Sequence, residues 1–344
     1  MRKLGSPQFF LIGMLILAAG CRSAAPSEKI IMRVGYFPNI THSQALIGLA
    51  RGDFQTALGE NVDIRTTQFN AGPSAIEALF AGQIDLTYIG PNPAINGFIK
   101  SEGEALRIVC GATSGGAAFI VRPAAMIRTA ADLAGKKIAS PQLGNTQDVA
   151  LRGYILANGL KTLEQGGDVE VVPTDNPLIL DMFRLGAIDG AWVPEPWASR
   201  LIVDGGGEVF LDERDLWTET GGEFVTAHII VSTKFLAEHP EQVKAWLRAH
   251  VEVTRWELEN PADAQTLLNG EIEKLTGKKL AAEVLTMAWG RMTVTWDPIT
   301  ASLLASAQSA YEAGFLKEEP NLDGIYDLSI LNAVLGEKGL PPVA

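Results

Sequence analysis

Short apolar segments rich in β-branched residues alternate with helical segments along the first two thirds of the chain, and this alternation restricts the fold more than any other feature. One series begins at residues 31–37, IMRVGYF, and a second begins at residues 136–141, KKIASP. A strand, a helix and another strand at this spacing form a parallel βαβ unit. The sequence therefore predicts an α/β fold in which the βαβ series occurs twice.

The length of the chain predicts two lobes, and its last third predicts a helical C-terminal tail. A chain of 344 residues exceeds what one hydrophobic core usually organises, so two lobes with a cleft between them are expected. From His239 onward the strand segments stop and helical patterns with polar connectors follow. No long linker separates this helical C-terminal tail from the rest, so we expect the tail to pack on an existing lobe.

The N-terminus has the pattern of a secretory signal. Arg2 and Lys3 form a basic start, and residues 9–19 form an apolar run that is too short to span a bilayer. The run ends in LAAGC, residues 17–21, which resembles the lipobox of bacterial lipoproteins. That resemblance implies a signal peptide at residues 1–20, lipidation of Cys21 and a tether at residues 21–29. The alternative is an ordinary signal peptide with Cys21 as a small apolar residue.

The cysteine content and the net charge restrict the possible disulfides and the classes of ligand. The chain has only Cys21 and Cys110, so a lipidated Cys21 leaves no intramolecular disulfide. Loss of Arg2 and Lys3 with the signal peptide leaves 26 basic against 40 acidic residues, which changes the formal net charge from -12 to -14. Such an acidic body argues against nucleic acid, whose phosphates need cations. It does not exclude a small anion, because a site can be locally positive.

Residues 78–93 and 182–196 form a weak internal repeat. Each contains a helix end, a Gly, an Ile-Asp pair and a strand with an aromatic residue, and each then turns at a proline. The corresponding positions are Gly82, Ile84, Asp85 and Tyr88 against Gly186, Ile188, Asp189 and Trp192. We interpret the Gly and Asp positions as helix C-caps and strand entries. Both copies bring the carboxyl end of a strand to a helix N-terminus, where open α/β sheets bind ligands.

Four polar segments precede predicted helices, at residues 39–43, 70–74, 91–93 and 144–147. The first amide groups of a helix have no intrahelical partner and form the positive end of its dipole, so several such ends can bind an anion without a lysine. N-capping by these side chains remains an alternative. The predicted ligand-binding residues here are Asn39, Thr41, His42, Asn70, Gly72, Ser74, Asn92, Asn145 and Thr146.

Other candidates lie at strand ends. Tyr88 and Trp192 are predicted to form an apolar wall for an alkyl or aryl group, although large aromatic residues are often simply core. Glu195 could pair with an amine of the ligand, or could complement a helix dipole. His228 is predicted to face the cleft because it lies in an expected crossing between the lobes.

Four segments of the chain are similar to the substrate-binding proteins of the nitrate, sulfonate and taurine class of bacterial ABC importers. They are VGYFPNITHSQALIGLARG, NAGPSAIEALFAGQIDLTYIGPNPAI, GAIDGAWVPEPWASRLI and FVTAHIIVSTKFLAEHPEQVKAWLRAH. The resemblance implies a two-lobed type II periplasmic-binding fold, with a mixed sheet flanked by helices in each lobe. It places lobe 1 at residues 30–115 and 227–344, lobe 2 at residues 116–226, and the crossings near residues 115–118 and 224–228.

The function that follows is binding without catalysis. The sequence has no clustered His and Cys, no G-x-S-x-G or H-E-x-x-H motif and no nucleotide fingerprint, and its four scattered histidines argue against a metal centre. The resemblance implies a monomeric, lipid-anchored protein on the extracytoplasmic face, without a cofactor, that delivers a small oxyanion to an ABC permease. We expect an aliphatic sulfonate. Nitrate, bicarbonate or a thiamine-precursor-like pyrimidine remain alternatives, as does a sensor lipoprotein of the same fold.

Overall fold

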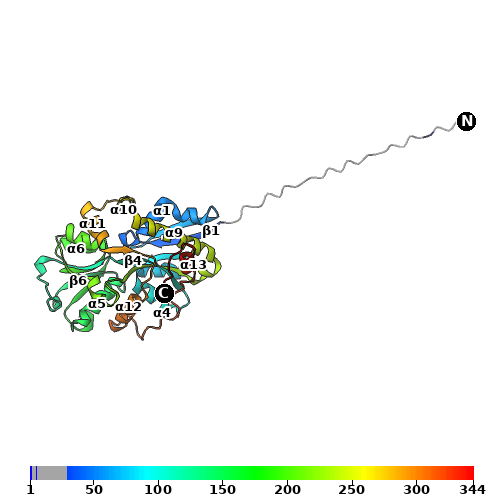
Figure 1. Cartoon of the computed structure of the whole chain (residues 1–344). Helices are drawn as coiled ribbons and strands as arrows, with labels where there is room; N and C mark the ends of the chain where they lie inside the picture. Colours follow the sequence, from blue (N-terminus) through cyan, green and yellow to red (C-terminus); the bar gives the residue numbers. More distant parts are fainter. Residues whose placement is uncertain (2–4, 6–28) are drawn as a thin grey trace.

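The computed structural model describes Met1, Gly5 and residues 29–344, and two sheets organise it (Figure 1). The rest of the predicted signal peptide, Cys21 and the tether up to residue 28 lie outside the described residues. Among the residues that are described, no helix combines the length and the apolar character needed to cross a bilayer.

The first sheet, which defines lobe 1, has six strands in the order β11-β4-β10-β3-β1-β2. Strand β1 pairs in parallel with β2 and β3, whereas β10 runs antiparallel to β3 and β4. The short strand β11 pairs antiparallel with β4. The elements of the first chain passage are β1 (Ile30–Tyr36), α1 (Ser43–Arg51), α2 (Asp53–Leu58), β2 (Val62–Gln68), α3 (Gly72–Phe80), β3 (Leu86–Ile89), α4 (Pro91–Lys100) and β4 (Leu106–Gly115).

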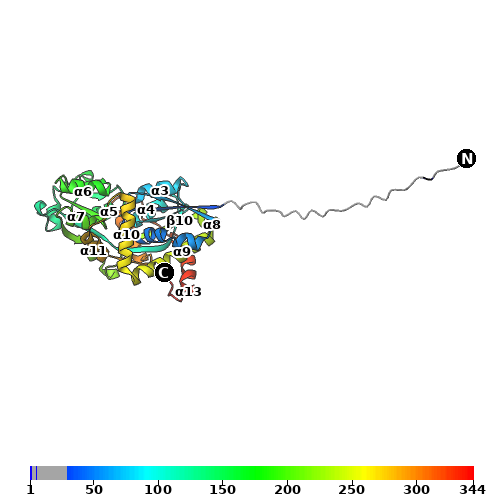
Figure 2. The ribbon, with the colours of Figure 1, turned by 90° about the horizontal axis from the view of Figure 1, so that it is seen from above.

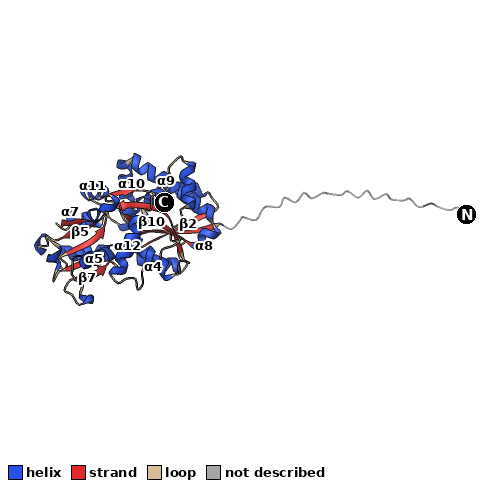
Figure 3. Ribbon diagram, turned by 60° about the horizontal axis from the view of Figure 1, so that its bottom comes forward, coloured by secondary structure: helices blue, strands red, loops and turns tan. Residues whose placement is uncertain are grey.

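The second sheet, which defines lobe 2, repeats this plan with five strands in the order β7-β6-β8-β5-β9. Strand β6 is parallel to β7 and β8, and β5 is antiparallel to β8 and β9. Both sheets are therefore mixed and flanked by helices, as predicted (Figure 3). The elements are β5 (Ala117–Val121), β6 (Lys137–Pro141), α5 (Thr146–Ala157), β7 (Glu170–Thr174), α6 (Asn176–Arg184), β8 (Gly190–Pro194), α7 (Trp197–Val203) and β9 (Glu208–Asp212).

The chain passes between the sheets twice. It leaves lobe 1 through Gly115 and Gly116, both with positive φ, and the amide of Gly116 donates to the carbonyl of Arg291. It returns through residues 213–224. Residues 225–228, which we expected in the crossing, already belong to β10 (Val225–Ser232), because hydrogen bonds to β3 and β4 extend along that whole strand.

The C-terminal tail is almost entirely helical, as predicted, and it contacts both lobes. The expectation that the strands stop at His239 is wrong at β11, which pairs with the edge of the lobe 1 sheet at β4. It consists of α8 (Thr233–Glu238), α9 (Pro240–Glu259), α10 (Pro261–Thr276), α11 (Ala282–Gly290), β11 (Met292–Val294), α12 (Thr300–Glu312) and α13 (Ser329–Glu337). Helices α9 and α13 pack on lobe 1, but α11 packs on α7, and α12 packs on both α4 and α5. Figure 2 shows α10 lying across the middle of the molecule. The tail thus joins the two lobes in addition to the crossings.

The internal repeat has a structural explanation. Asp85 precedes β3, and its Oδ2 accepts the amide proton of Arg33 in the neighbouring strand at 2.8 Å. Asp189 precedes β8, and its Oδ2 accepts from the amide of Lys137 at 2.9 Å. Gly82 and Gly186 both adopt positive φ just after a helix end, as a C-terminal helix cap requires. The interpretation of these positions as caps and strand entries is confirmed.

Candidate ligand-binding site

A small cavity of about 20 Å³ lies between the lobes, at the carboxyl ends of the parallel strands. We call it the inner cavity. Within the described part of the chain, no Lys, Arg, Asp or Glu lines it. Its lining consists of Phe37, Asn39, Thr41, His42, Asn70, Ala71, Gly90, Asn145, Thr146, Gln147, Asn176, Pro194 and Thr226. Amide, hydroxyl and imidazole groups from both lobes therefore meet in one place.

Lobe 1 contributes a donor from His42. The amide of Phe37 donates to Nδ1 of His42 at 3.3 Å, so a neutral imidazole has its proton on Nε2. Burial, with a smaller contribution from nearby His228, lowers the pKa of His42 to about 3. The ring is therefore neutral around pH 7 and offers one N–H group.

Helix starts from both lobes surround the inner cavity. Residues at the beginnings of α3, α4, α5 and α6 line it, namely Ala71, Gly90, Asn145, Thr146 and Asn176. In the described structure none of these four helices has a hydrogen bond from its N-cap side chain. The N–H groups of their first turns have no intrahelical partner, although Pro73, Pro91, Pro93 and Pro177 carry no N–H. The positive ends of four helix dipoles are therefore directed to the same small space.

The alternative role of these polar side chains, as N-caps of the helices that follow them, is not observed in the described structure. The hydroxyl of Ser74 donates to the carbonyl of Ala71 at 2.9 Å, and the hydroxyl of Ser43 donates to Glu257 at 2.6 Å. Neither accepts a backbone amide, and Asn145 makes no cap at α5 within the described residues. The polar residues before these helices are thus not used as N-caps.

Two polar atoms in the lining lack a partner within the described residues. They are Oγ1 of Thr146 and Oδ1 of Asn176, and both are buried. Buried polar atoms are hydrogen-bonded in the large majority of cases. Their position at the inner cavity indicates a site that a polar ligand completes.

Six predicted residues line the inner cavity: Asn39, Thr41, His42, Asn70, Asn145 and Thr146. Gly72 and Ser74 lie beside it but are not part of its lining. At Gly72 a Cβ atom would meet Pro93 Cγ at 2.2 Å and Asn145 Oδ1 at 3.3 Å. Gly72 therefore serves close packing of α3 against α4 and against lobe 2.

Three predicted residues lie in the cores of the lobes, away from the inner cavity. The hydroxyl of Tyr88 is hydrogen-bonded to Nδ1 of His250 at 3.0 Å. Trp192 Nε1 donates to Glu213 at 2.7 Å, and Asn92 Nδ2 donates to the carbonyl of Ser306 at 3.2 Å. Strands β3 and β8 are buried on both faces, so their aromatic side chains enter hydrophobic cores and form no wall of the cleft.

Glu195 and His228 are also buried outside the lining. Glu195 accepts from the amide and the hydroxyl of Ser199, and its Oε1 lies 3.7 Å from Nε of Arg291. Burial raises its pKa to about 7. His228 lies inside β10, and among the described residues neither ring nitrogen has a hydrogen-bond partner. Burial lowers its pKa to about 3.

Sequence reasoning missed part of the lining, most clearly Gly90, Asn176 and Thr226. Asn176 follows β7 and begins α6, the same strand, turn and helix pattern that identified the other four segments. That pattern could have identified it. Thr226 gave no local signal, because it lies within a strand and reaches the cavity through the tertiary arrangement of β10.

Side chains of the two lobes bond to each other at the edge of the inner cavity. Trp197 Nε1 donates to Asn39 Oδ1 at 3.1 Å, and Asn70 Nδ2 donates to Asp175 Oδ2 at 3.4 Å. A cavity of about 20 Å³ has room for about one water molecule. This is a closed arrangement of the lobes.

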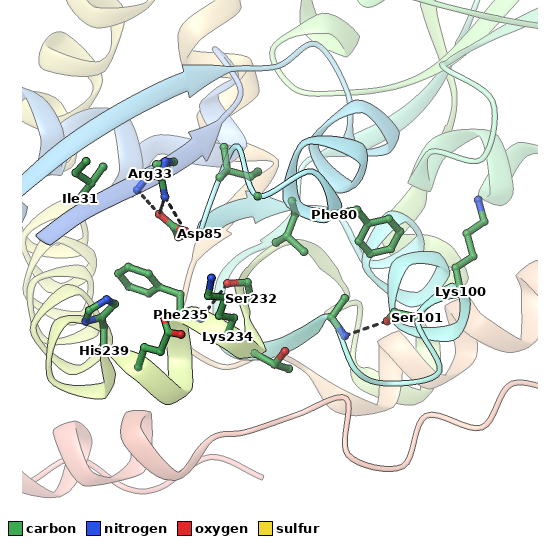
Figure 4. Close-up of a pocket in the computed structure, with 16 residues that line it drawn as sticks. Ile31, Arg33, Phe80, Asp85, Lys100, Ser101, Ser232, Lys234, Phe235 and His239 are labelled. Carbon is green, nitrogen blue, oxygen red and sulfur yellow. Dashed lines mark hydrogen bonds and ion pairs between the residues drawn. The ribbon is translucent and has the colours of Figure 1, made fainter.

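Figure 4 shows a larger cavity of about 780 Å³ at the amino ends of β1 and β3, the opposite end of the lobe 1 sheet. Its central ion pair joins Arg33 Nη1 to Asp85 at 3.3 Å, so these charges connect neighbouring strands. Among the residues that the structure describes, no group of three His, Cys, Asp or Glu could hold a metal ion.

Comparison with known proteins identifies chains of similar sequence and fold. The taurine-binding periplasmic protein of Escherichia coli K12 is 26% identical over 317 residues, which cover 90% of this chain and 93% of that protein. The solved alkanesulfonate-binding protein SsuA of Xanthomonas axonopodis pv. citri, bound to MOPS, superposes with a TM-score of 0.71 at 20% identity and covers 88% and 99% of the two chains. The nitrate-binding protein NrtA of Synechocystis gives 0.72 at 15% identity, with 91% and 90% covered.

These solved structures share the two-lobed fold with this chain and confirm the predicted architecture. Residues 25–269 match the NMT1-like family. That match covers more than two thirds of the sequence, including the second sheet, every strand of the first sheet except β11, and the first part of the helical tail. The chain belongs to the NMT1-like family.

Proposed function

We propose that this protein binds a small oxyanion outside the cytoplasm, an aliphatic sulfonate in particular, and delivers it to an ABC permease. The observation that supports this best is the meeting of four helix N-termini at a cavity whose lining, among the described residues, is uncharged. Relatives that bind taurine or alkanesulfonate, by their names, point to the same ligand class.

An anion suits this lining for physical reasons. Backbone amides at helix N-termini, the N–H group of His42 and the hydroxyl of Thr146 can all donate to oxygen atoms. Hydrogen bonds with an ionised acceptor are stronger than those between neutral groups. No carboxylate among the described lining residues would repel the ligand. The site thus needs no buried lysine, whose desolvation would be costly.

Both lobes supply donors, so binding favours the closed arrangement. A sulfonate head group is larger than a water molecule, and the lobes therefore have to part beyond the present arrangement to admit it. The bonds Trp197–Asn39 and Asn70–Asp175 join the lobes near the cavity edge and must break when the lobes part there.

The proposal includes the location of the protein. A signal peptide at residues 1–20, lipidation of Cys21 and a short tether would keep a monomer on the extracytoplasmic face of the membrane beside the permease. The LAAGC sequence at residues 17–21 supports this part, as do the periplasmic relatives. We include neither a catalytic role nor a cofactor in the proposal.

Thermal unfolding of the full-length protein with single ligands tests the binding function. A true ligand at a hundredfold excess over its Kd stabilises the folded state by about 2.7 kcal/mol. We expect ethanesulfonate and taurine to raise the Tm, and nitrate, bicarbonate and a pyrimidine to leave it unchanged. A response to nitrate, bicarbonate or the pyrimidine alone would replace the sulfonate assignment. No response to any of them, nor to the larger 1-naphthalenesulfonate, would overturn the proposal.

A further inference from the structure

A second interlobe cavity, of about 650 Å³, adjoins the inner cavity, and we call it the outer cavity. Three parts of the chain enclose it. Lobe 1 contributes Pro38 and Gln68, lobe 2 contributes Pro177 and Trp197, and the tail contributes residues of α10, the following loop and α11. The helical tail is thus a wall of a binding space in addition to a link between the lobes.

Three side chains line both cavities: Asn39, Asn70 and Asn176. Two of them make the hydrogen bonds between the lobes, Asn39 with Trp197 and Asn70 with Asp175. These asparagines separate the inner from the outer cavity. The body of a ligand whose head group occupies the inner cavity could therefore extend past them into the outer cavity.

Half of the residues that line the outer cavity are apolar. Besides three prolines and Trp197, its apolar lining includes Ile272, Leu275, Leu280, Ala281 and Val284. Two of its three cationic groups have partners: Arg200 Nε lies 3.2 Å from Asp204, and Lys279 Nζ lies 3.3 Å from Glu273. The third, Lys278, is exposed and has no ion-pair partner among the described residues. Arg200 also lies over the Trp197 ring, 4.7 Å from the ring centroid. This chemistry suits an uncharged organic body and provides a rigid aromatic surface for it.

We infer that the outer cavity binds the organic body of the ligand, and that this protein prefers organosulfonates with a ring-sized apolar body to two-carbon sulfonates. The inference rests on the proposed function, since the inner cavity must hold the anionic head group. A volume of about 650 Å³ lies within the range of pockets that enclose drug-sized ligands. A two-carbon sulfonate would leave this apolar surface uncovered.

A comparison of two sulfonates that share a head group tests the inference. Calorimetric Kd values of the full-length protein are measured for ethanesulfonate and for 1-naphthalenesulfonate. We expect naphthalenesulfonate to bind at least about tenfold more tightly than ethanesulfonate, because its rings bury apolar area that ethanesulfonate does not have. Equal affinities would overturn the preference.

A bulky side chain introduced into the outer cavity should remove the preference for naphthalenesulfonate. Ala281 and Ala282 are neighbouring, exposed alanines at the start of α11, but only Ala281 lines the outer cavity. We expect Ala281→Trp to reduce the ratio of the two Kd values about tenfold, and the matched variant Ala282→Trp to retain the wild-type ratio. The same ratio in both variants would contradict the assignment.

Trp197 provides a second, independent test. Trp197→Phe removes the N–H donor to Asn39 but keeps an aromatic surface, whereas Trp197→Ala removes both. The preference for naphthalenesulfonate should persist in the Phe variant and disappear in the Ala variant. Failure of both sulfonates to bind the wild-type protein would instead overturn the proposed function, so the two failures are distinguishable.

Discussion

We expect the buried hydroxyl of Thr146 to contribute to ligand binding but not to the stability of the ligand-free protein. Oγ1 of Thr146 is buried at the inner cavity and has no hydrogen-bond partner within the described residues. In the ligand-free protein such a group stabilises nothing, because its desolvation is not offset. With a bound oxyanion it gains an acceptor. The same atom should therefore matter only when the ligand is present.

We expect Thr146→Val to keep or slightly raise the Tm of the ligand-free protein and to weaken sulfonate binding about tenfold, since a hydrogen bond to a charged group contributes about 1.5–3 kcal/mol. Thr254→Val is the control, because the Thr254 hydroxyl donates to the carbonyl of His250 in the core. That variant should lose stability and keep its affinity. Unchanged affinity in Thr146→Val would remove this residue from the site.

A buried carboxyl group gives a prediction about pH. Glu257 accepts from Ser43 at 2.6 Å, and burial raises its pKa to about 8 from an ordinary value of 4.5. Between these values the folded state binds more protons than the unfolded state, so stability falls as pH rises. Glu257→Gln should abolish this part of the pH dependence, and its Tm should exceed the wild-type Tm at pH 8 by more than at pH 4.5. The same difference in Tm between Glu257→Gln and the wild type at pH 4.5 and at pH 8 would contradict this prediction.

At the scale of elements, helix N-termini organise the site. Helices α3 and α4 from lobe 1 and α5 and α6 from lobe 2 begin at the inner cavity. Short side chains at these starts allow the helices to approach each other. A Cβ atom on Gly90 would lie 2.3 Å from Oγ1 of Thr146 in the other lobe. The start of α4 is therefore in contact with the start of α5.

We expect Gly90→Ala to weaken ligand binding by at least about tenfold, because either the lobes stay apart or the Thr146 hydroxyl turns away. Small-angle scattering with saturating sulfonate should give a larger radius of gyration than for the wild type if the lobes stay apart. Gly270→Ala is the control, since Gly270 lies within α10 with no atom within 4 Å of a Cβ. It should gain up to about 1 kcal/mol of stability without a change in affinity.

For the molecule as a whole, the helical tail joins the lobes, and the proposed lipid anchor would determine where the protein acts. The tail packs on both lobes through α11 and α12, so opening of the cleft must include a shift of these helices against α7 and α5. Strand β1 starts at Ile30, only nine residues after Cys21 in the sequence. A short tether would therefore hold lobe 1 near the membrane.

Cys21→Ala tests the anchoring. We expect the variant to appear in the soluble extracytoplasmic fraction and the wild type in the membrane fraction, because the variant lacks the thiol that would carry the lipid. Cys110→Ala, which removes a buried thiol of lobe 1, is the control and should remain in the membrane fraction. Retention of Cys21→Ala in the membrane would contradict lipid anchoring.

Local patterns were sufficient for much of the fold. Alternating strands and helices predicted two α/β units, and the repeated Gly and Asp positions predicted caps and strand entries that Asp85 and Asp189 do form. Helix starts after strands predicted Asn39, Asn70 and Asn145 at one cavity. These predictions depended on spacing and backbone preferences, which act over a few residues and can therefore be read from the chain.

Local sequence patterns thus specify the secondary-structure elements, their order and the polar character of the helix starts. They do not specify that Tyr88 and Trp192 enter cores, that Thr226 reaches the cavity from within a strand, or that α10 and α11 line the outer cavity. Those features follow from burial and neighbour contacts, which depend on packing between segments far apart in the chain. Packing of the two lobes and the tail determines which face of each strand or helix is buried and which residues cover it.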